Sequence, residues 1–139
     1  MKAVVLGTGG WGTAISQILC DNGHETYLWS HNPAKAAEMA RTRENPLLKG
    51  VILQDALHIT GDLDCLKGAD LVVSAPPSFA VRETAGKMAP YLTEKTVVVS
   101  VSKGIERDTN LRLSQVIGEE IGHICPVAAL SGPSHAEEV

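Results

Sequence analysis

A glycine-rich turn near the N-terminus has the spacing of a phosphate-binding loop. Residues 7–12 read G-T-G-G-W-G and match the pattern G-x-G-x-x-G. The turn follows a short apolar run and opens an amphipathic stretch, which is the context that this motif requires. Gly7 allows a tight turn, Gly9 lets the backbone approach a pyrophosphate, and Gly12 lets a helix lie close to the strand. Free N–H groups at the helix start attract phosphates. We therefore expect a dinucleotide site here rather than a plain strand-to-helix turn.

The residues that follow the second apolar run bear on the choice of dinucleotide. A carboxylate at this point accepts a hydrogen bond from the ribose 2′-hydroxyl of NAD. This chain has Trp29-Ser30-His31-Asn32 instead, so a 2′-phosphate meets no like charge. No arginine stands there to hold a phosphate, which leaves Lys35 as the nearest cation. NAD and NADP both stay open, and His31 is either a ribose contact or an exposed loop residue.

Three further segments carry side chains able to do chemistry, and each follows an expected strand. Ligands of open parallel sheets bind beyond the carboxyl ends of the strands. Ser74 to Phe79 contains two prolines, and its aromatic ring either covers a cofactor or packs in the core. Residues 102–106 place Lys103 beside a glycine, as a site residue or a solvated loop charge. Residues 131–135 read S-G-P-S-H, where the histidine is either a site residue or solvated.

An alternation of apolar strands and amphipathic helices positions these segments. Strands are expected at 2–6, 25–29, 57–60, 70–75, 96–101 and 126–130. Helices or helical turns are expected at 11–22, 33–40, 63–67, 78–88 and 111–121, with a loop at 45–54. This order predicts an α/β fold, a doubly wound parallel sheet with right-handed crossovers and helices on both faces. We expect residues 1–139 to form one Rossmann-type dinucleotide-binding domain.

The composition excludes several classes of protein. The chain has 139 residues, of which 44% are apolar and 20% charged, so it is not a disordered segment. A net charge of −4 gives no basic surplus for nucleic acid. No apolar run reaches the ~18 residues that a membrane span needs, and Met1 to Leu6 is too short for a signal peptide. Cys20, Cys65 and Cys125 lack metal-site spacing, so we expect buried thiols, no metal and a cytoplasmic protein.

Three motifs together resemble one enzyme family. They are G-T-G-G-W-G-T-A at 7–14, V-S-K-G-I-E at 101–106 and L-S-G-P-S-H-A-E-E-V at 130–139. In this order they resemble the NAD(P)-dependent sn-glycerol-3-phosphate dehydrogenases of bacterial type, and the last two motifs are much more specific than the first. The loop at Asn45-Pro46, with Leu48 and Gly50, is also similar to a loop of that family, although Lys49 replaces its usual proline.

The resemblance implies reversible hydride transfer between NAD or NADP and the pair dihydroxyacetone phosphate and sn-glycerol 3-phosphate, for glycerophospholipid synthesis. It implies substrate contacts at Lys103, Gly132 and Ser134. Family members often have arginine at the position of Asn32, which weakens the case for an NADP preference. With the glycine loop and Phe79, the expected cofactor-binding residues are Gly7, Gly9, Gly10, Trp11, Gly12, His31, Asn32, Phe79, Lys103 and Ala136.

The proton-transferring lysine of the family lies in a helical second domain that has no counterpart in these residues. We therefore expect an enzyme only as a full-length protein, with a homodimer left open, and no turnover from residues 1–139 alone. Ser134 and Glu137 have the spacing of a capping box, which predicts a helix that has barely begun at Val139. We expect the chain to be part of a longer protein, cut close to a domain boundary.

Two alternatives remain. One is a non-catalytic module that senses nicotinamide nucleotides, although such modules usually carry an acidic residue after the second strand. The other is a related dehydrogenase of the ketopantoate or 6-phosphogluconate type, which the motifs at 101–106 and 130–139 disfavour.

Overall fold

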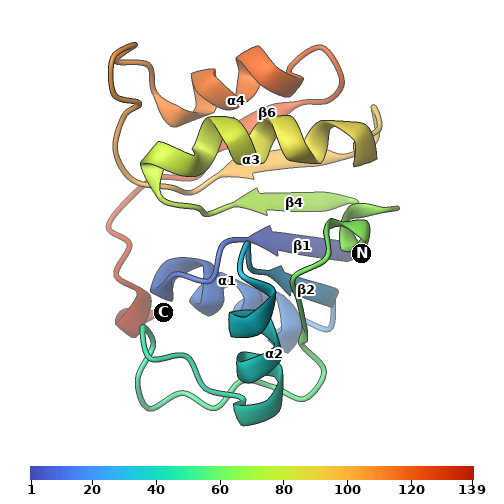
Figure 1. The fold of residues 1–139 in the computed structure, drawn as a ribbon, viewed down its shortest axis with the longest axis vertical. Helices are drawn as coiled ribbons and strands as arrows, with labels where there is room; N and C mark the ends of the chain where they lie inside the picture. The colour runs from blue at the N-terminus through green and yellow to red at the C-terminus, as the bar shows by residue number, and fades with distance from the viewer.

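A six-stranded parallel sheet forms the centre of the protein in the computed structural model, which describes all residues 1–139 (Figure 1). The order of the strands is β3-β2-β1-β4-β5-β6, and every neighbouring pair is parallel. The strands are β1 (Lys2–Leu6), β2 (Glu25–Trp29), β3 (His58–Thr60), β4 (Leu71–Ser74), β5 (Val97–Ser100) and β6 (Val127–Ala129). The chain winds outward from β1 to one edge, then crosses to β4 and winds to the other edge, which places a switch point between β1 and β4.

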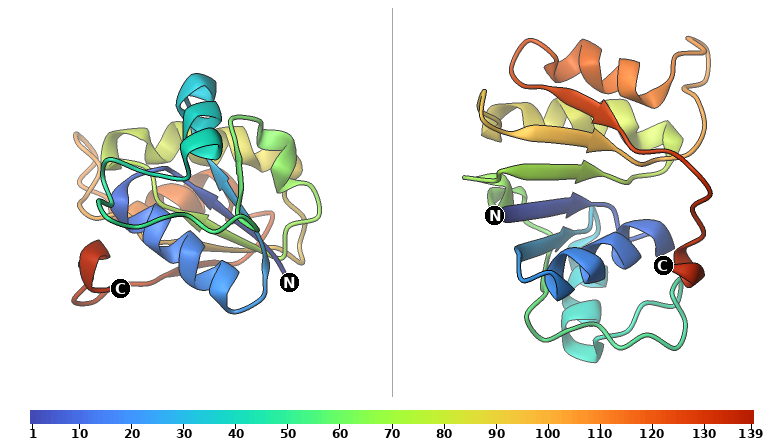
Figure 2. Two further views of the ribbon diagram at one scale, coloured as in Figure 1. Left: turned by 90° about the horizontal axis from the view of Figure 1, so that it is seen from below. Right: turned by 180° about the vertical axis from the view of Figure 1, so that it is seen from behind.

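Helices cover both faces of the sheet. They are α1 (Gly10–Asp21), α2 (Pro33–Thr42), α3 (Val81–Met88) and α4 (Leu113–Ile121). The helices α3 and α4 contact each other on one face, and the view from behind shows α1 on the opposite face (Figure 2). The α/β fold and all six expected strands are thus confirmed.

Two hydrophobic clusters, one on each side of the sheet, form the core. The larger contains 17 buried residues, among them Val4 and Val72 from the sheet and Ile117 from α4. The smaller contains eight buried residues, including Val5 and Cys20. Because the central strands are buried on both faces, they are continuous apolar runs rather than alternating ones. All three cysteines are buried and unpaired, as expected of small core residues.

Three local expectations were wrong. The segment 78–88 is not one helix, because Ser78–Ala80 forms a separate 3-10 turn and α3 begins at Val81. The helix expected from residue 111 begins at Leu113, because an antiparallel bridge between Ile105 and Arg112 holds the preceding residues.

The capping box expected at residues 134–137 is also absent. The chain instead forms a short 3-10 turn, Ala136–Glu138, whose N-cap is His135 and which has no side-chain capping bond. One backbone bond, from the Glu138 N–H to the carbonyl of His135 (3.0 Å), closes this turn. The backbone of residues 135–138 thus places the first turn one residue later than the Ser134 cap requires.

Candidate functional site

A cleft of about 620 Å³ opens at the carboxyl ends of β1, β2 and β4. The glycine turn 7–12 lines it, together with residues 75–80, which follow β4. Trp29 and His31 contribute from the end of β2, and Lys103 from the end of β5. The cleft lies at the switch point of the sheet, where open α/β folds bind ligands.

The glycine turn is tightly packed at Gly7 and Gly12 and open at Gly9. Gly7 has a φ of +124°, and a Cβ placed on it would lie 2.5 Å from the carbonyl oxygen of Ala75. A Cβ on Gly12 would lie 2.3 Å from the carbonyl oxygen of Gly7. A Cβ on Gly9, in contrast, would meet no atom within 4 Å. Gly7 and Gly12 are therefore required by the turn itself, whereas Gly9 leaves free space.

The N-terminus of α1 is suited to an anion. Its N-cap is Gly9, no side chain caps it, and its first turn contains no acidic residue. The first N–H groups of a helix have no partner within the helix, and the helix dipole gives them partial positive charge. These features fit the diphosphate of a dinucleotide, because its charge needs N–H donors and close backbone approach.

The end of β2 leads directly into the cap of α2. The Asn32 Oδ1 caps α2 by accepting hydrogen bonds from the N–H groups of Ala34 (3.0 Å) and Lys35 (3.2 Å). Asn32 does not line the cleft, whereas the neighbouring His31 does. The Asn32 side-chain oxygen is thus already used, and His31 is the better placed of the two for a ribose.

The far wall of the cleft is formed by the start of α3 and the turn before it. Phe79 is 88% exposed, so it is not a core residue. Glu83 lies near His31, and its pKa is lowered mainly by a hydrogen bond from Lys87 and more weakly by His31. Sequence reasoning did not single out Trp29, Leu47, Glu83, Thr84 or Lys87, all of which line the cleft. Ligands bind beyond the carboxyl ends of parallel strands, so the segment after β4 was the signal that could have indicated Glu83, Thr84 and Lys87 on α3.

The C-terminal segment lies beside the start of α1 and is bonded to Lys103. The Lys103 Nζ donates a hydrogen bond of 2.6 Å to the carbonyl oxygen of Ser134. The Cβ of Ala136 lies 3.6 Å from the position that a Cβ on Gly10 would occupy. The view from behind shows this segment crossing to the start of α1 (Figure 2). Lys103 lines the cleft, whereas Ser134 and Ala136 do not line it but adjoin it through Lys103 and Gly10. Gly132 is exposed and makes no such contact.

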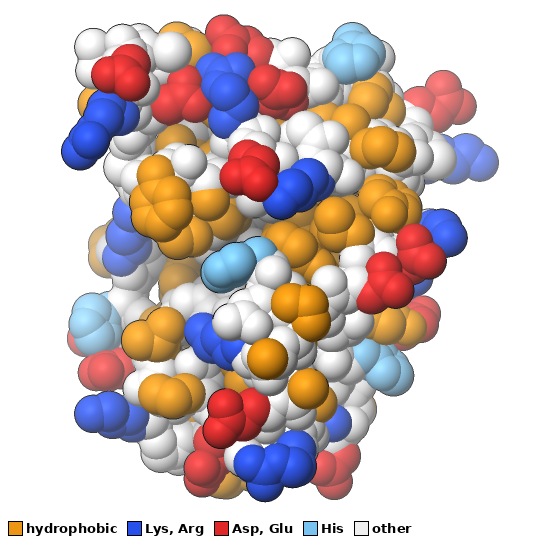
Figure 3. Space-filling model, viewed as in Figure 1, with side chains coloured by type: hydrophobic (Ala, Val, Ile, Leu, Met, Phe, Trp, Pro, Cys, Tyr) orange, Lys and Arg blue, Asp and Glu red, His pale blue; other side chains and the backbone are white.

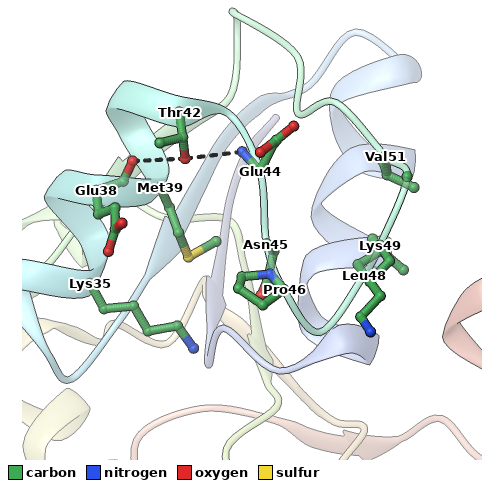
Figure 4. A pocket seen from close by; sticks show the side chains of 11 residues that line it. Lys35, Glu38, Met39, Thr42, Glu44, Asn45, Pro46, Leu48, Lys49 and Val51 are labelled. Atoms are coloured by element: carbon green, nitrogen blue, oxygen red, sulfur yellow. Dashed lines mark hydrogen bonds between the residues drawn. The ribbon is translucent and has the colours of Figure 1, made fainter.

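A second cavity, of about 490 Å³, lies between α2 and residues 44–51 (Figure 4). Met39 and Asn45, both buried, line it together with the side chains of Lys35 and Lys49. Lys35 also lines the main cleft. This residue therefore stands between the two cavities, next to the end of β2.

No group of three or more His, Cys, Asp or Glu side chains is arranged to hold a metal ion. No helix has both the length and the apolar character needed to cross a membrane.

The switch-point cleft, the glycine turn and the uncapped start of α1 define a Rossmann-type dinucleotide-binding domain. A family model described as the N-terminus of NAD-dependent glycerol-3-phosphate dehydrogenase matches residues 2–139. The chain belongs to this family.

Curated relatives and solved structures agree with this assignment. The chain is 43% identical over 143 residues to glycerol-3-phosphate dehydrogenase [NAD(P)+] of Chlorobium luteolum, covering 100% of this chain and 43% of the relative. It is 45% identical to the protein of the same name from Desulfitobacterium hafniense, over 99% of this chain and 39% of that relative. The crystal structure of glycerol-3-phosphate dehydrogenase from Coxiella burnetii matches with a TM-score of 0.89 and 31% identity, over 99% of this chain and 42% of that one. This chain thus spans less than half the length of these relatives.

Proposed function

We propose that this chain is the cofactor-binding part of an NAD(P)-dependent glycerol-3-phosphate dehydrogenase, and that the whole protein interconverts dihydroxyacetone phosphate and sn-glycerol 3-phosphate. The observation that carries the proposal is the cleft shared by the glycine turn and Lys103, with the segment 134–136 bonded to Lys103 and lying next to Gly10. The names of the relatives support the reaction and the two possible cofactors.

In this proposal, the residues of this chain bind the cofactor and the substrate and orient them for the reaction. The uncapped start of α1 holds the diphosphate of the cofactor, and His31 faces the adenosine ribose. The nicotinamide, when bound, supplies or accepts the hydride. Lys103 lies at the end of β5, where its ammonium neutralises negative charge on the phosphorylated substrate or on the oxygen that is reduced. The proton for that oxygen comes from a group outside residues 1–139.

The test uses the full-length protein and the 139-residue chain in parallel. We expect the full-length protein to oxidise NADH or NADPH when dihydroxyacetone phosphate is added, and the 139-residue chain to bind reduced cofactor without turnover. Cofactor binding is measured by quenching of tryptophan fluorescence, because Trp11 and Trp29 both line the cleft.

The same assay separates the alternatives. Cofactor binding without turnover of any substrate by the full-length protein would indicate a nucleotide sensor. Turnover with ketopantoate or with 6-phosphogluconate, but not with dihydroxyacetone phosphate, would assign the chain to a related dehydrogenase. On the proposed function, we also expect the protein to act in glycerophospholipid synthesis in the cytoplasm.

A further inference from the structure

Arg82, on α3, lies at the centre of a cluster with three glutamates. Its guanidinium makes a two-pronged contact with Glu106, through Nε to Oε2 and Nη2 to Oε1, both at 2.8 Å. It also donates to Glu119 (2.8 Å) and to Glu120 (3.0 Å), both on α4. Figure 3 shows acidic side chains gathered around a basic one on the face formed by α3 and α4. The proposed cofactor and substrate contacts use none of these four residues.

Glu106 is the inner member of this cluster and the anchor of a loop. Its side chain is only 16% exposed, against 53% for Glu119. The Glu106 N–H donates to the carbonyl of Leu111 (2.9 Å), and the Thr109 hydroxyl donates to Glu106 Oε1 (2.7 Å). The hydrogen bonds from Arg82, followed by the one from Thr109, lower the pKa of the Glu106 carboxyl to about 2. Residues 102–112 therefore form a closed loop whose main side-chain tie to α3 is Glu106.

Lys103 lies on this loop between two attachment points. On one side, the Ser102 hydroxyl donates a hydrogen bond of 2.5 Å to the carbonyl of Pro76. On the other side, Glu106 binds Arg82, three residues after Lys103. Between them, Gly104 has a φ of +104° and packs near Ser78. The direction of Lys103 toward the cleft is thus set by a short segment held at both ends.

We propose that Arg82 and Glu106 are positioning residues, which fix the loop 102–112 to α3 so that the ammonium of Lys103 meets the substrate. The proposal rests on the proposed function, because the substrate defines the task of Lys103. The same helix carries Glu83, Thr84 and Lys87 in the wall of the cleft. The pair therefore ties Lys103 to the frame that holds the cofactor.

Glu119 offers a matched control within the cluster. Glu106 and Glu119 each accept a hydrogen bond from the same Arg82 nitrogen, Nη2, at 2.8 Å. Replacement of either by glutamine removes one negative charge from the same guanidinium. Only Glu106, however, belongs to the loop that carries Lys103. A purely electrostatic role predicts that neither change loosens the loop 102–112, whereas a positioning role predicts that Glu106→Gln alone loosens it.

The experiment compares Glu106→Gln, Glu119→Gln, Arg82→Lys and Arg82→Gln in the full-length protein. We expect Glu106→Gln to lower kcat/KM for dihydroxyacetone phosphate about tenfold or more, since small displacements of a positioned group cost that much. The Kd for NADH should change less than about twofold, a difference of under roughly 0.4 kcal/mol. Glu119→Gln should leave both values near those of the parent. Arg82→Lys should retain more activity than Arg82→Gln, because the lysine keeps a charge opposite Glu106.

A second measurement does not depend on activity. Amide hydrogen exchange should speed up in residues 103–111 of Glu106→Gln, with residues 97–100 of β5 unchanged, and should not change in Glu119→Gln. Equal effects of the two glutamate changes on kcat/KM, or an unchanged loop in Glu106→Gln, would overturn the proposal. A parent protein that does not act on dihydroxyacetone phosphate would instead contradict the proposed function. In that case the exchange data still decide whether Glu106 holds the loop.

Discussion

The side-chain amide of Asn45 donates a hydrogen bond of 3.0 Å to the carbonyl oxygen of Thr8, 37 residues earlier in the chain. The same nitrogen donates to the Thr13 hydroxyl (2.8 Å), which in turn donates to the carbonyl of Gly9 (2.9 Å). Asn45 is 2% exposed. One buried amide thus ties the loop after α2 to both sides of the glycine turn, and it holds in shape the backbone that faces the cleft.

Replacement of Asn45 by aspartate tests this tie. The carboxylate has the same shape but has no N–H to donate, and it faces the Thr8 carbonyl. Buried polar groups that lose their partner cost about 1–3 kcal/mol each, so we expect a loss of stability of at least that size. Urea denaturation monitored by circular dichroism measures the loss. Asn110→Asp, at an exposed position, is the control and should unfold near the parent midpoint. A fully stable Asn45→Asp protein would contradict the assigned role.

Gly9 and Gly12 are expected to respond in opposite ways. Gly9→Val should fold normally, because a Cβ there meets no atom within 4 Å, but it should weaken NADH binding about tenfold or more by filling the phosphate site. Gly12→Ala should lose about 1–3 kcal/mol or more of stability, because its Cβ would lie 2.3 Å from the Gly7 carbonyl. Thermal unfolding and fluorescence titration distinguish the two effects. Unchanged cofactor affinity in Gly9→Val would contradict the position assigned to the diphosphate.

Lys35 is expected to contribute more to binding of NADPH than of NADH. It lines the cleft and the adjoining cavity, next to a strand end without a carboxylate (Figure 4). Lys35→Met should therefore weaken NADPH binding about tenfold and NADH binding much less, because only NADPH carries the 2′-phosphate. Lys49→Met, which alters the other lysine of the second cavity, is the matched control. Equal losses for both cofactors would exclude a 2′-phosphate contact by Lys35.

The fold could be predicted from the sequence because its signals are local. Three neighbouring strands contain unbroken apolar runs, which are A-V-V-L at 3–6, L-V-V at 71–73 and V-V-V at 97–99. Helical stretches with turn residues at their ends separate the strands. Gly7 and Gly12 were predictable for the same reason, since the motif and its strand-to-helix context are contiguous. The capping of α2 by Asn32 was also within reach, because an asparagine directly before Pro33 is a common start of a helix.

The remaining features depend on residues far apart in the chain. Asn45 meets Thr8 across 37 positions, and Arg82 meets Glu106 across 24. A single sequence holds no signal that pairs residues at such distances. Asn45 could therefore be noted only because its loop resembles one of the family, and Arg82 only as one position of the helix expected at 78–88. The capping box at 134–137 failed for a related reason, because a pattern of four residues says nothing about the neighbours that decide the backbone of Ser134.

Lys103 is expected to affect substrate more strongly than cofactor. Its ammonium bonds the Ser134 carbonyl at 2.6 Å, and Lys103 follows β5 rather than belonging to the glycine turn that is assigned to the diphosphate. In the full-length protein, Lys103→Ala should lower kcat/KM for dihydroxyacetone phosphate by about a hundredfold or more, because it removes a charge placed for the reacting groups. The Kd for NADH should rise far less. Wild-type kinetics in this variant would make Lys103 an ordinary surface charge.

The stability of the protein should depend on pH through Glu106. Its pKa falls from the ordinary 4.5 to about 2 in the folded protein, chiefly because of the hydrogen bonds from Arg82. Below pH 4.5 the Glu106 carboxyl binds a proton in the unfolded chain but not yet in the folded one. The contribution of Glu106 to the free energy of unfolding therefore decreases as the pH falls toward 2. The difference in free energy of unfolding between the parent and Glu106→Gln should therefore be constant above about pH 5.5 and shrink below it. Arg82→Gln should remove the same pH-dependent contribution to the free energy of unfolding. Urea denaturation at a series of pH values measures both, and parallel curves for the parent and Glu106→Gln down to pH 2 would show that the Arg82 contact does not hold the carboxylate.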